Sequence, residues 1–335
     1  MRLPRIKPEG LSFYHCISRA VDGLFIFRTD SHGSLEAEKF LLTMRRLAAF
    51  CCIRVLNYSL MSNHFHLLCE VPEPRVLSEA EILERVEAGH GSGRRQALEQ
   101  RIARLRQKPD GADQIQRLLE RYRKRMFDIS IFLKELKGGF AQWYNRRHKR
   151  YGVLWAERFK SLLVEGGTAL AAVAAYIDLN PVRVGLCTDP KDYRYCGYAE
   201  AVAKGSGLAC EGIRAALGKP ETATWEEVGR EYRRYLFVRG SQGTESKPPA
   251  FDLATAQAVV DEQNGELSLP EHLRCTIRYF TDGVILGSQA FVESHFDKFK
   301  EKLGYKRQRR ATQITVLGTS DPLWAFRKMR VRATG

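Results

Sequence analysis

The sequence lacks the features that mark a secreted or membrane-bound protein. Its eight cysteines form no Cys-x-x-Cys pair, and several lie inside apolar runs, as buried free thiols do. No signal-peptide core follows the first residues, and no apolar run reaches the length that spans a membrane. These absences argue against a disulfide framework and against a membrane span. We therefore expect a soluble, intracellular protein in a reducing compartment, the cytoplasm.

Acidic residues are scarce relative to basic ones. The chain has 39 Asp and Glu against 54 Lys and Arg, which gives a net charge of +15. A surplus of this size favours a polyanionic partner, with nucleic acid as the leading candidate. The alternative is a basic surface that only keeps the protein soluble. The 335 residues suffice for two domains, or for one domain with large insertions.

Predicted strands and helices alternate in an order that defines a fold class. Aromatic and β-branched residues predict strands at 11–18, 52–60, 64–71 and 159–164. Apolar residues at helical spacing predict helices at 35–50, 129–147 and 169–179, the last ending at Asn180-Pro181. This order is that of an α+β, ferredoxin-like split βαβ core. We expect an antiparallel sheet with helices on one face, which leaves the other face open to a ligand.

Two further regions flank this core. The core domain spans 1–204. Within it, a charged helical insertion covers about 77–126, with breaks at 89–93 and 109–111. A helical segment and linker follow at 205–250, and a small, helical, basic region at 251–335. Within these regions we predict helices at 225–238, 254–262, 270–280 and 288–303 and basic clusters at 306–310 and 327–332. The last region is either an accessory DNA-binding module or a solvated tail.

The segment 61–68 (Met-Ser-Asn-His-Phe-His-Leu-Leu) holds two histidines that flank one apolar residue. Side chains alternate along a strand, so His64 and His66 should project from one face and Phe65 from the other. Two neighbouring imidazoles on a rigid face can share a divalent metal ion. The alternative is a pair of half-buried polar residues on an edge strand.

A second candidate element lies more than a hundred residues later. Tyr176 and Asn180 are four residues apart, so they share one face of a helix. Asn180 could offer an amide oxygen to a metal held by the two histidines, with Tyr176 one turn away. A divalent ion on a phosphodiester would assist attack by the phenol, and a covalent phosphotyrosine would conserve the ester energy. The alternative for Tyr176 is a helix tyrosine that packs its ring on the sheet.

Together these residues resemble the single-tyrosine HUH transposases, in particular the branch of REP-associated tyrosine transposases. The resemblance covers about residues 11–203 and is carried by the segments 14–19, 61–68, 140–149, 155–161 and 175–185. It implies that His64 and His66 are metal ligands, that Tyr176 is the nucleophile and that Asn180 is the third ligand. It also implies Mg²⁺ or Mn²⁺ as cofactor and single-stranded DNA next to an imperfect hairpin as substrate. The product would be a 5′-phosphotyrosine and a free 3′-hydroxyl.

Several other residues are candidates for DNA contact. Trp155 could stack on an unpaired base, and five basic residues could contact phosphates, namely Arg146, Arg147, Arg158, Lys160 and Arg183. We expect no membrane partner, a monomer or homodimer, and a location with the DNA of a prokaryotic-type cell. Two alternatives stay open: a hairpin-DNA-binding protein that has lost catalysis, and a metal-dependent nuclease that uses water. The sequence leaves open whether Tyr176 acts within its own subunit.

Overall fold

The computed structural model describes residues 6–27, 34–240, 257, 283–299, 311–314 and 323–327. Helices and strands both contribute, so the predicted α+β class is confirmed. Four strands form the first half of the sheet in the order β2-β3-β1-β4, each antiparallel to its neighbours. Their bounds are Ser12–Arg19 for β1, Arg54–Met61 for β2, His64–Val71 for β3 and Lys160–Val164 for β4.

Helices cover both faces of this sheet. On one face, Phe65 of β3 packs against Phe40 of α1 (Leu35–Phe50), with ring centres 4.8 Å apart. Phe40 in turn contacts Phe140 of α5 (Ile129–Arg147). On the opposite face, His66 contacts Tyr176 of α6 (Thr168–Arg183). The prediction of helices on one face only was therefore wrong, because α6 lies across the face that was expected to be open.

The composition of α6 explains this position. Every residue from Ala169 to Val182 is buried, and six of the first eight are alanine or other small apolar side chains that permit close packing. A helix that is apolar on all sides needs covering on all sides, a signal present in the sequence. The helix also continues through Pro181 to Arg183, where the sequence predicted an end. Asn180 therefore lies within the last turns of α6.

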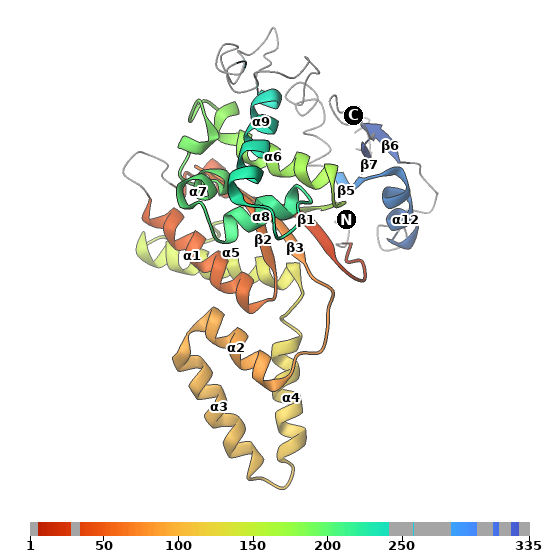
Figure 1. The fold of residues 1–335 in the computed structure, drawn as a ribbon. Coiled ribbons are helices and arrows are strands. Elements are labelled where there is room, and N and C mark those ends of the chain that lie inside the picture. Colours follow the sequence, from red (N-terminus) through yellow and green to blue (C-terminus); the bar gives the residue numbers. More distant parts are fainter. Residues whose placement is uncertain are drawn as a thin grey trace, which may run out of the picture.

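The insertion forms three helices, α2 (Glu79–His90), α3 (Ser92–Arg106) and α4 (Gly111–Arg123), which confirms both predicted breaks. We call these helices the arm. Ser78 and Glu81 form a capping box at the start of α2, which fixes where the arm begins. Figure 1 shows the arm projecting from one end of the molecule, with α3 and α4 reaching farthest from the sheet.

The C-terminal region contributes strands as well as helices, so the prediction of a helical extension was wrong. Strand β5 (Gly283–Gly287) pairs with β4 in parallel, and β6 (Thr312–Ile314) and β7 (Leu323–Arg327) extend the same sheet. Helix α12 (Gln289–Phe299) falls within the helix predicted at 288–303. The helices predicted at 254–262 and 270–280 and both basic clusters lie outside the described residues, apart from residues 257 and 327.

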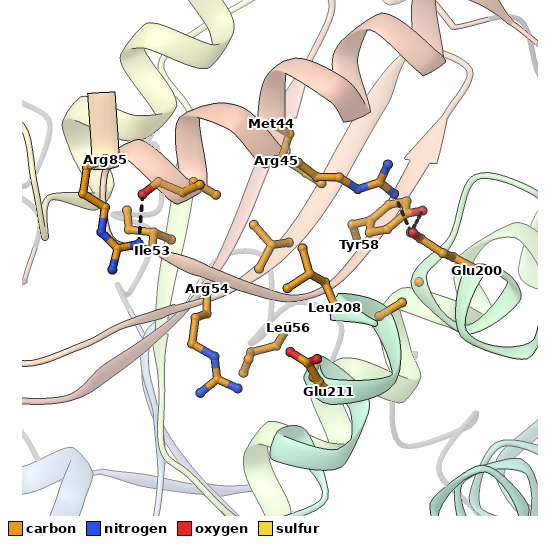
Figure 2. A pocket seen from close by; sticks show the side chains of 16 residues that line it. Met44, Arg45, Ile53, Arg54, Leu56, Tyr58, Arg85, Glu200, Leu208 and Glu211 are labelled. Carbon is orange, nitrogen blue, oxygen red and sulfur yellow. Dashed lines mark hydrogen bonds and ion pairs between the residues drawn. The ribbon is translucent and has the colours of Figure 1, made fainter. Parts of the chain in front are cut away.

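Helices α7 (Gly197–Lys204), α8 (Leu208–Ala216) and α9 (Trp225–Gly240) complete the cover of β2 and α6. Helix α8 approaches β2 so closely that a Cβ atom on Gly212 would lie 2.0 Å from the carbonyl oxygen of Leu56. Between α1, β2 and α8 a mostly apolar hollow of about 240 Å³ remains, which Figure 2 shows from close by. An Arg45–Glu200 ion pair lies at its edge, and no predicted site residue lines it.

The described residues bear on two expectations from the sequence, namely free cysteines and no membrane span. The seven cysteines among them are all free thiols, and Cys275 lies outside them. No helix in the described ranges is both long enough and apolar enough to cross a membrane.

Candidate functional site

The two predicted histidines lie at the start of β3, where the hairpin with β2 ends. Because side chains alternate along the strand, His64 and His66 share one face. Their ring centres are 5.1 Å apart. Asn63 Oδ1 lies 2.7 Å from His64 Nδ1, which leaves the other ring nitrogen of His64 for a further partner. The strand therefore presents the pair in the arrangement that the sequence predicted.

A third histidine, which sequence reasoning missed, joins the pair from the neighbouring strand. Residue 15 of β1 lies opposite Leu68 of β3, so His15 projects from the same face as His66. His15 Nε2 and His66 Nδ1 are 3.0 Å apart, and their rings are stacked. One of these nitrogens carries the shared proton. The signal for His15 lies in the register between two strands, and the sequence alone does not give it.

The two predicted histidines are poor proton acceptors at this position. Burial, together with the charge of Arg19 opposite it, lowers the pKa of His64 to about 4. Burial also lowers the pKa of His66 well below its usual value, with His15 and His64 adding to the effect. At neutral pH the pair is uncharged, which is the form that binds metals.

Tyr176 lies over these histidines. Its ring centre is 5.8 Å from that of His15 and 5.8 Å from that of His66, in edge-on geometry. The side chain is 3% exposed, and burial raises the pKa of its phenol. The Arg183 guanidinium, 4.6 Å from the ring centre, and the Asn180 amide both lower that pKa in part. The structure thus brings Tyr176, Asn180 and Arg183 to the histidine face in the same chain.

The donor set around His64 and His66 fits a metal ion in geometry. A metal about 2.1 Å from one nitrogen of each ring lies about 3.2 Å from each ring centre, so two such rings are about 4.5 Å apart in an octahedral site and about 5.2 Å apart in a tetrahedral one. The separation of 5.1 Å lies within this range. Asn180 is buried on the same side, and the atom that would bind a metal is its amide oxygen, because the amide nitrogen is only a donor.

No group of three or more His, Cys, Asp or Glu side chains in the described ranges is arranged to hold a metal. The predicted third ligand is an amide, and amides are not among those residue types. The metal site therefore stays a prediction that rests on two histidines and Asn180.

A buried carboxylate fixes the helix that carries Tyr176. Asp178 Oδ2 accepts hydrogen bonds from Asn57 Nδ2 of β2 and from the Tyr232 hydroxyl of α9, both at 2.7 Å. Asp178 Oδ1 accepts one from the backbone N–H of Tyr198 at the start of α7. Burial raises the pKa of Asp178 to about 6 despite these donors. One side chain thus joins α6 to three other elements.

Basic side chains border the histidine face on two strands. Arg19 lies opposite His64 in the register and is exposed, yet sequence reasoning passed over it. Lys160 lies opposite Ile17, whose own partner on β3 is His66, so it shares that face and is exposed as well. Arg183, over the Tyr176 ring, adds a third cation to this face.

The other predicted DNA contacts lie elsewhere. Trp155 packs edge-on against Phe65, on the opposite face of the sheet, and its indole N–H donates to the Lys137 carbonyl. Arg147 pairs with Glu36 at 3.5 Å near the end of α5, and Arg146 is exposed on the same turn. Arg158 is exposed in the segment before β4. Trp155 is thus half-buried on the face opposite the histidines, and its stacking role stays a prediction.

Comparisons with known proteins find similarity among solved structures. No protein-family model matches the chain, and no curated protein matches it. Among solved structures, the chain is similar to that of a REP-associated tyrosine transposase bound to a REP hairpin. The identity is 11%, the TM-score is 0.38, and the match covers 62% of this chain and 90% of that one. The proposal below therefore rests on the chain's own residues.

Proposed function

We propose that this chain is a DNA strand transferase that cuts single-stranded DNA beside a hairpin through a covalent bond to Tyr176. One observation carries the proposal. Tyr176 meets His64 and His66 on one face of one sheet, although it lies more than a hundred residues after them in the sequence. The strand order β2-β3-β1-β4 with antiparallel neighbours supports a ferredoxin-like split βαβ core as the frame for this site.

The chain's own residues divide the work. His64, His66 and Asn180 would hold Mg²⁺ or Mn²⁺, and such an ion supplies polarisation of the phosphodiester and orientation of its leaving oxygen. His15 holds the ring of His66 in place through the contact at 3.0 Å. Arg19 and Lys160 would receive the DNA backbone at the exposed edge of the site beside His64.

The transfer balances without a nucleotide cofactor. The Tyr176 oxygen bonds to phosphorus, and the bond from phosphorus to the 3′ oxygen breaks. The phenol loses one proton and the leaving 3′ oxygen gains one, so the products are a 5′-phosphotyrosine and a 3′-hydroxyl. Arg183 over the ring favours the phenolate, and the reverse attack by a 3′-hydroxyl joins the strands.

One observation favours a second candidate, a hairpin-DNA-binding protein without catalysis. Tyr176 is 3% exposed, so a phosphate must enter beside His64 before it meets the phenol. A protein that only binds hairpins has no need of this entry.

Incubation of the purified chain with hairpin DNA that carries a single-stranded flank, in Mn²⁺, tests the proposal. A covalent protein–DNA band on a denaturing gel is expected. It should disappear with a chelator, with Tyr176→Phe and with His66→Ala, and persist in the control Tyr151→Phe, whose side chain is 94% exposed. Cleavage that survives Tyr176→Phe would identify a water-using nuclease. Binding without cleavage, unchanged by His66→Ala, would identify the second candidate.

A further inference from the structure

We infer that the outer two helices of the arm, α3 and α4, are a second DNA-binding surface, which holds the backbone of a duplex hairpin stem. The inference rests on the proposed function only in taking DNA as the polyanion. It concerns a part of the chain that contributes no residue to the site around Tyr176.

Charge is separated within the arm. Between Ser92 and Arg123 the chain has nine Lys and Arg against four Asp and Glu, whereas α2 has four Glu and one Arg. Some of the basic side chains serve the arm's own structure: Arg95 pairs with Glu87 and Arg106 pairs with Glu79, which ties α3 to α2. Arg123 donates to the Leu77 carbonyl.

A second group of arginines has no such role. Arg101, Arg104, Arg117 and Arg121 are exposed, and none forms an ion pair with an acidic side chain in the described ranges. Arg101, Arg117 and Arg121 border one hollow of about 280 Å³ between α3 and α4, together with Gln114. Arg117 and Arg121 are also one helical turn apart, a spacing at which like charges destabilise a helix. An anion in the hollow would remove this repulsion.

The side chains of the surface favour duplex over single-stranded DNA. Proteins that bind single strands stack the bases on aromatic rings, whereas the duplex backbone requires only cations. Tyr122 is the only aromatic residue between Ser92 and Arg123, and it is half-buried with its ring toward Phe50 of α1. The arginines around the hollow therefore offer phosphate contacts and no stacking platform.

The position of the arm sets the length of stem that can reach it. His64 and Val71 mark the two ends of β3, which span about 23 Å at about 3.3 Å per residue. The arm begins beyond Val71 and extends away from the sheet (Figure 1). At about 3.4 Å per base pair, a stem that starts at the histidines needs more than roughly 7 base pairs to reach the arginines.

Fluorescence anisotropy tests the inference in a Tyr176→Phe background, where DNA is bound and not cut. Two hairpins share the same single-stranded flank and have stems of about 16 and about 5 base pairs. With the long stem, R101Q/R117Q/R121Q should lower the slope of log affinity against log salt by about 2.7. The wild-type arm should then lose about 40-fold more affinity than the variant between 50 and 200 mM salt. With the short stem the variant should bind as the parent does.

Matched variants separate a site from general charge. R117Q/R121Q removes two arginines one turn apart on α4, and R230Q/R234Q removes two at the same spacing on α9, at the other end of the molecule (Figure 1). Only the first should change the salt slope, and R101K/R117K/R121K should restore it. Circular dichroism and Tm show that each variant is folded.

Three results would overturn the inference: equal effects of the two double variants, equal effects on both stems, or competition by polyglutamate as effective as by duplex DNA of equal charge. The proposed function is tested separately, because the arm variant with Tyr176 intact should still form the covalent adduct on the short hairpin. If the adduct forms and the arm variants bind as the parent does, only the inference about the arm is refuted. If the arm variants lose affinity and no adduct forms, only the proposed strand transfer is refuted.

Discussion

Replacing Asp178 with asparagine should remove a pH-dependent loss of stability from the helix that carries Tyr176. Asp178 is fully buried, and burial raises its pKa from 3.8 to about 6. Because the folded pKa lies above the unfolded one, the protonated form is favoured in the folded state. The stability that this group contributes is complete below pH 3.8 and is lost as the pH rises through about 6.

The size of the effect follows from the two pKa values. At about 1.4 kcal/mol per pKa unit, the rise from 3.8 to about 6 corresponds to about 3 kcal/mol over the whole titration. About 2 kcal/mol of this falls between about pH 4.5 and 7.5, the range in which unfolding can be compared. The asparagine side chain in D178N does not titrate, so the variant lacks this contribution. The other titrating groups are the same in both proteins and cancel in the difference.

Urea unfolding followed by tryptophan fluorescence measures this difference. The free energy of unfolding of the wild-type chain minus that of D178N should fall by about 2 kcal/mol as the pH rises across this range. A difference that stays constant would refute the account of Asp178. So would one that grows with pH, because that is the behaviour of a carboxylate stabilised by its donors Asn57 and Tyr232.

Two further predictions concern the histidine site and the packing that supports it. His15→Ala removes the ring that contacts His66 Nδ1, so the Mn²⁺ affinity measured by EPR titration should fall about 10- to 100-fold. The control His148→Ala, beside Glu36 at the end of α5, should leave the affinity unchanged. Equal affinity in His15→Ala would show that His15 does not orient His66. Gly212→Ala places a Cβ atom 2.0 Å from the Leu56 carbonyl oxygen and should cost about 1–3 kcal/mol or more in thermal unfolding. Its control Gly139→Ala, in open space on α5, should stabilise by up to about 1 kcal/mol, and a matching loss in both would contradict the close contact of α8 with β2.

Local patterns in the sequence predicted much of the core. The helices at 35–50 and 129–147 and the strand at 64–71 were predicted with the bounds that the structure has. These segments have strong periodicity and clear boundaries, such as the caps Ser34 and Asp128 that accept hydrogen bonds from the first turns. The placement of His64 and His66 on one face of the sheet followed from the alternation of side chains along a strand.

Features that depend on tertiary contacts were missed. His15 and Arg19 joined the site only through the register of β1 against β3, which no local pattern encodes. A proline disfavours helical backbone at the residue before it. Helix α6 nevertheless continues through Asn180 and Pro181, because packing on both sides of the helix outweighs that preference. The strands β5, β6 and β7 are short and pair with distant segments, so they carry little signal of their own. The predicted domain boundaries stay predictions.

The central claim is that the Tyr176 oxygen forms a bond to the 5′-phosphate of the DNA fragment that lies on the 3′ side of the cut. Mass spectrometry of the covalent complex, formed on hairpin DNA with distinct labels on its two ends and digested with protease and nuclease, tests it most directly. The account predicts one modified peptide that contains Tyr176, a 5′-linked phosphate on its phenol, and retention of the label from the 3′ side of the cut. A modified peptide from another part of the chain, or retention of the opposite label, would contradict it.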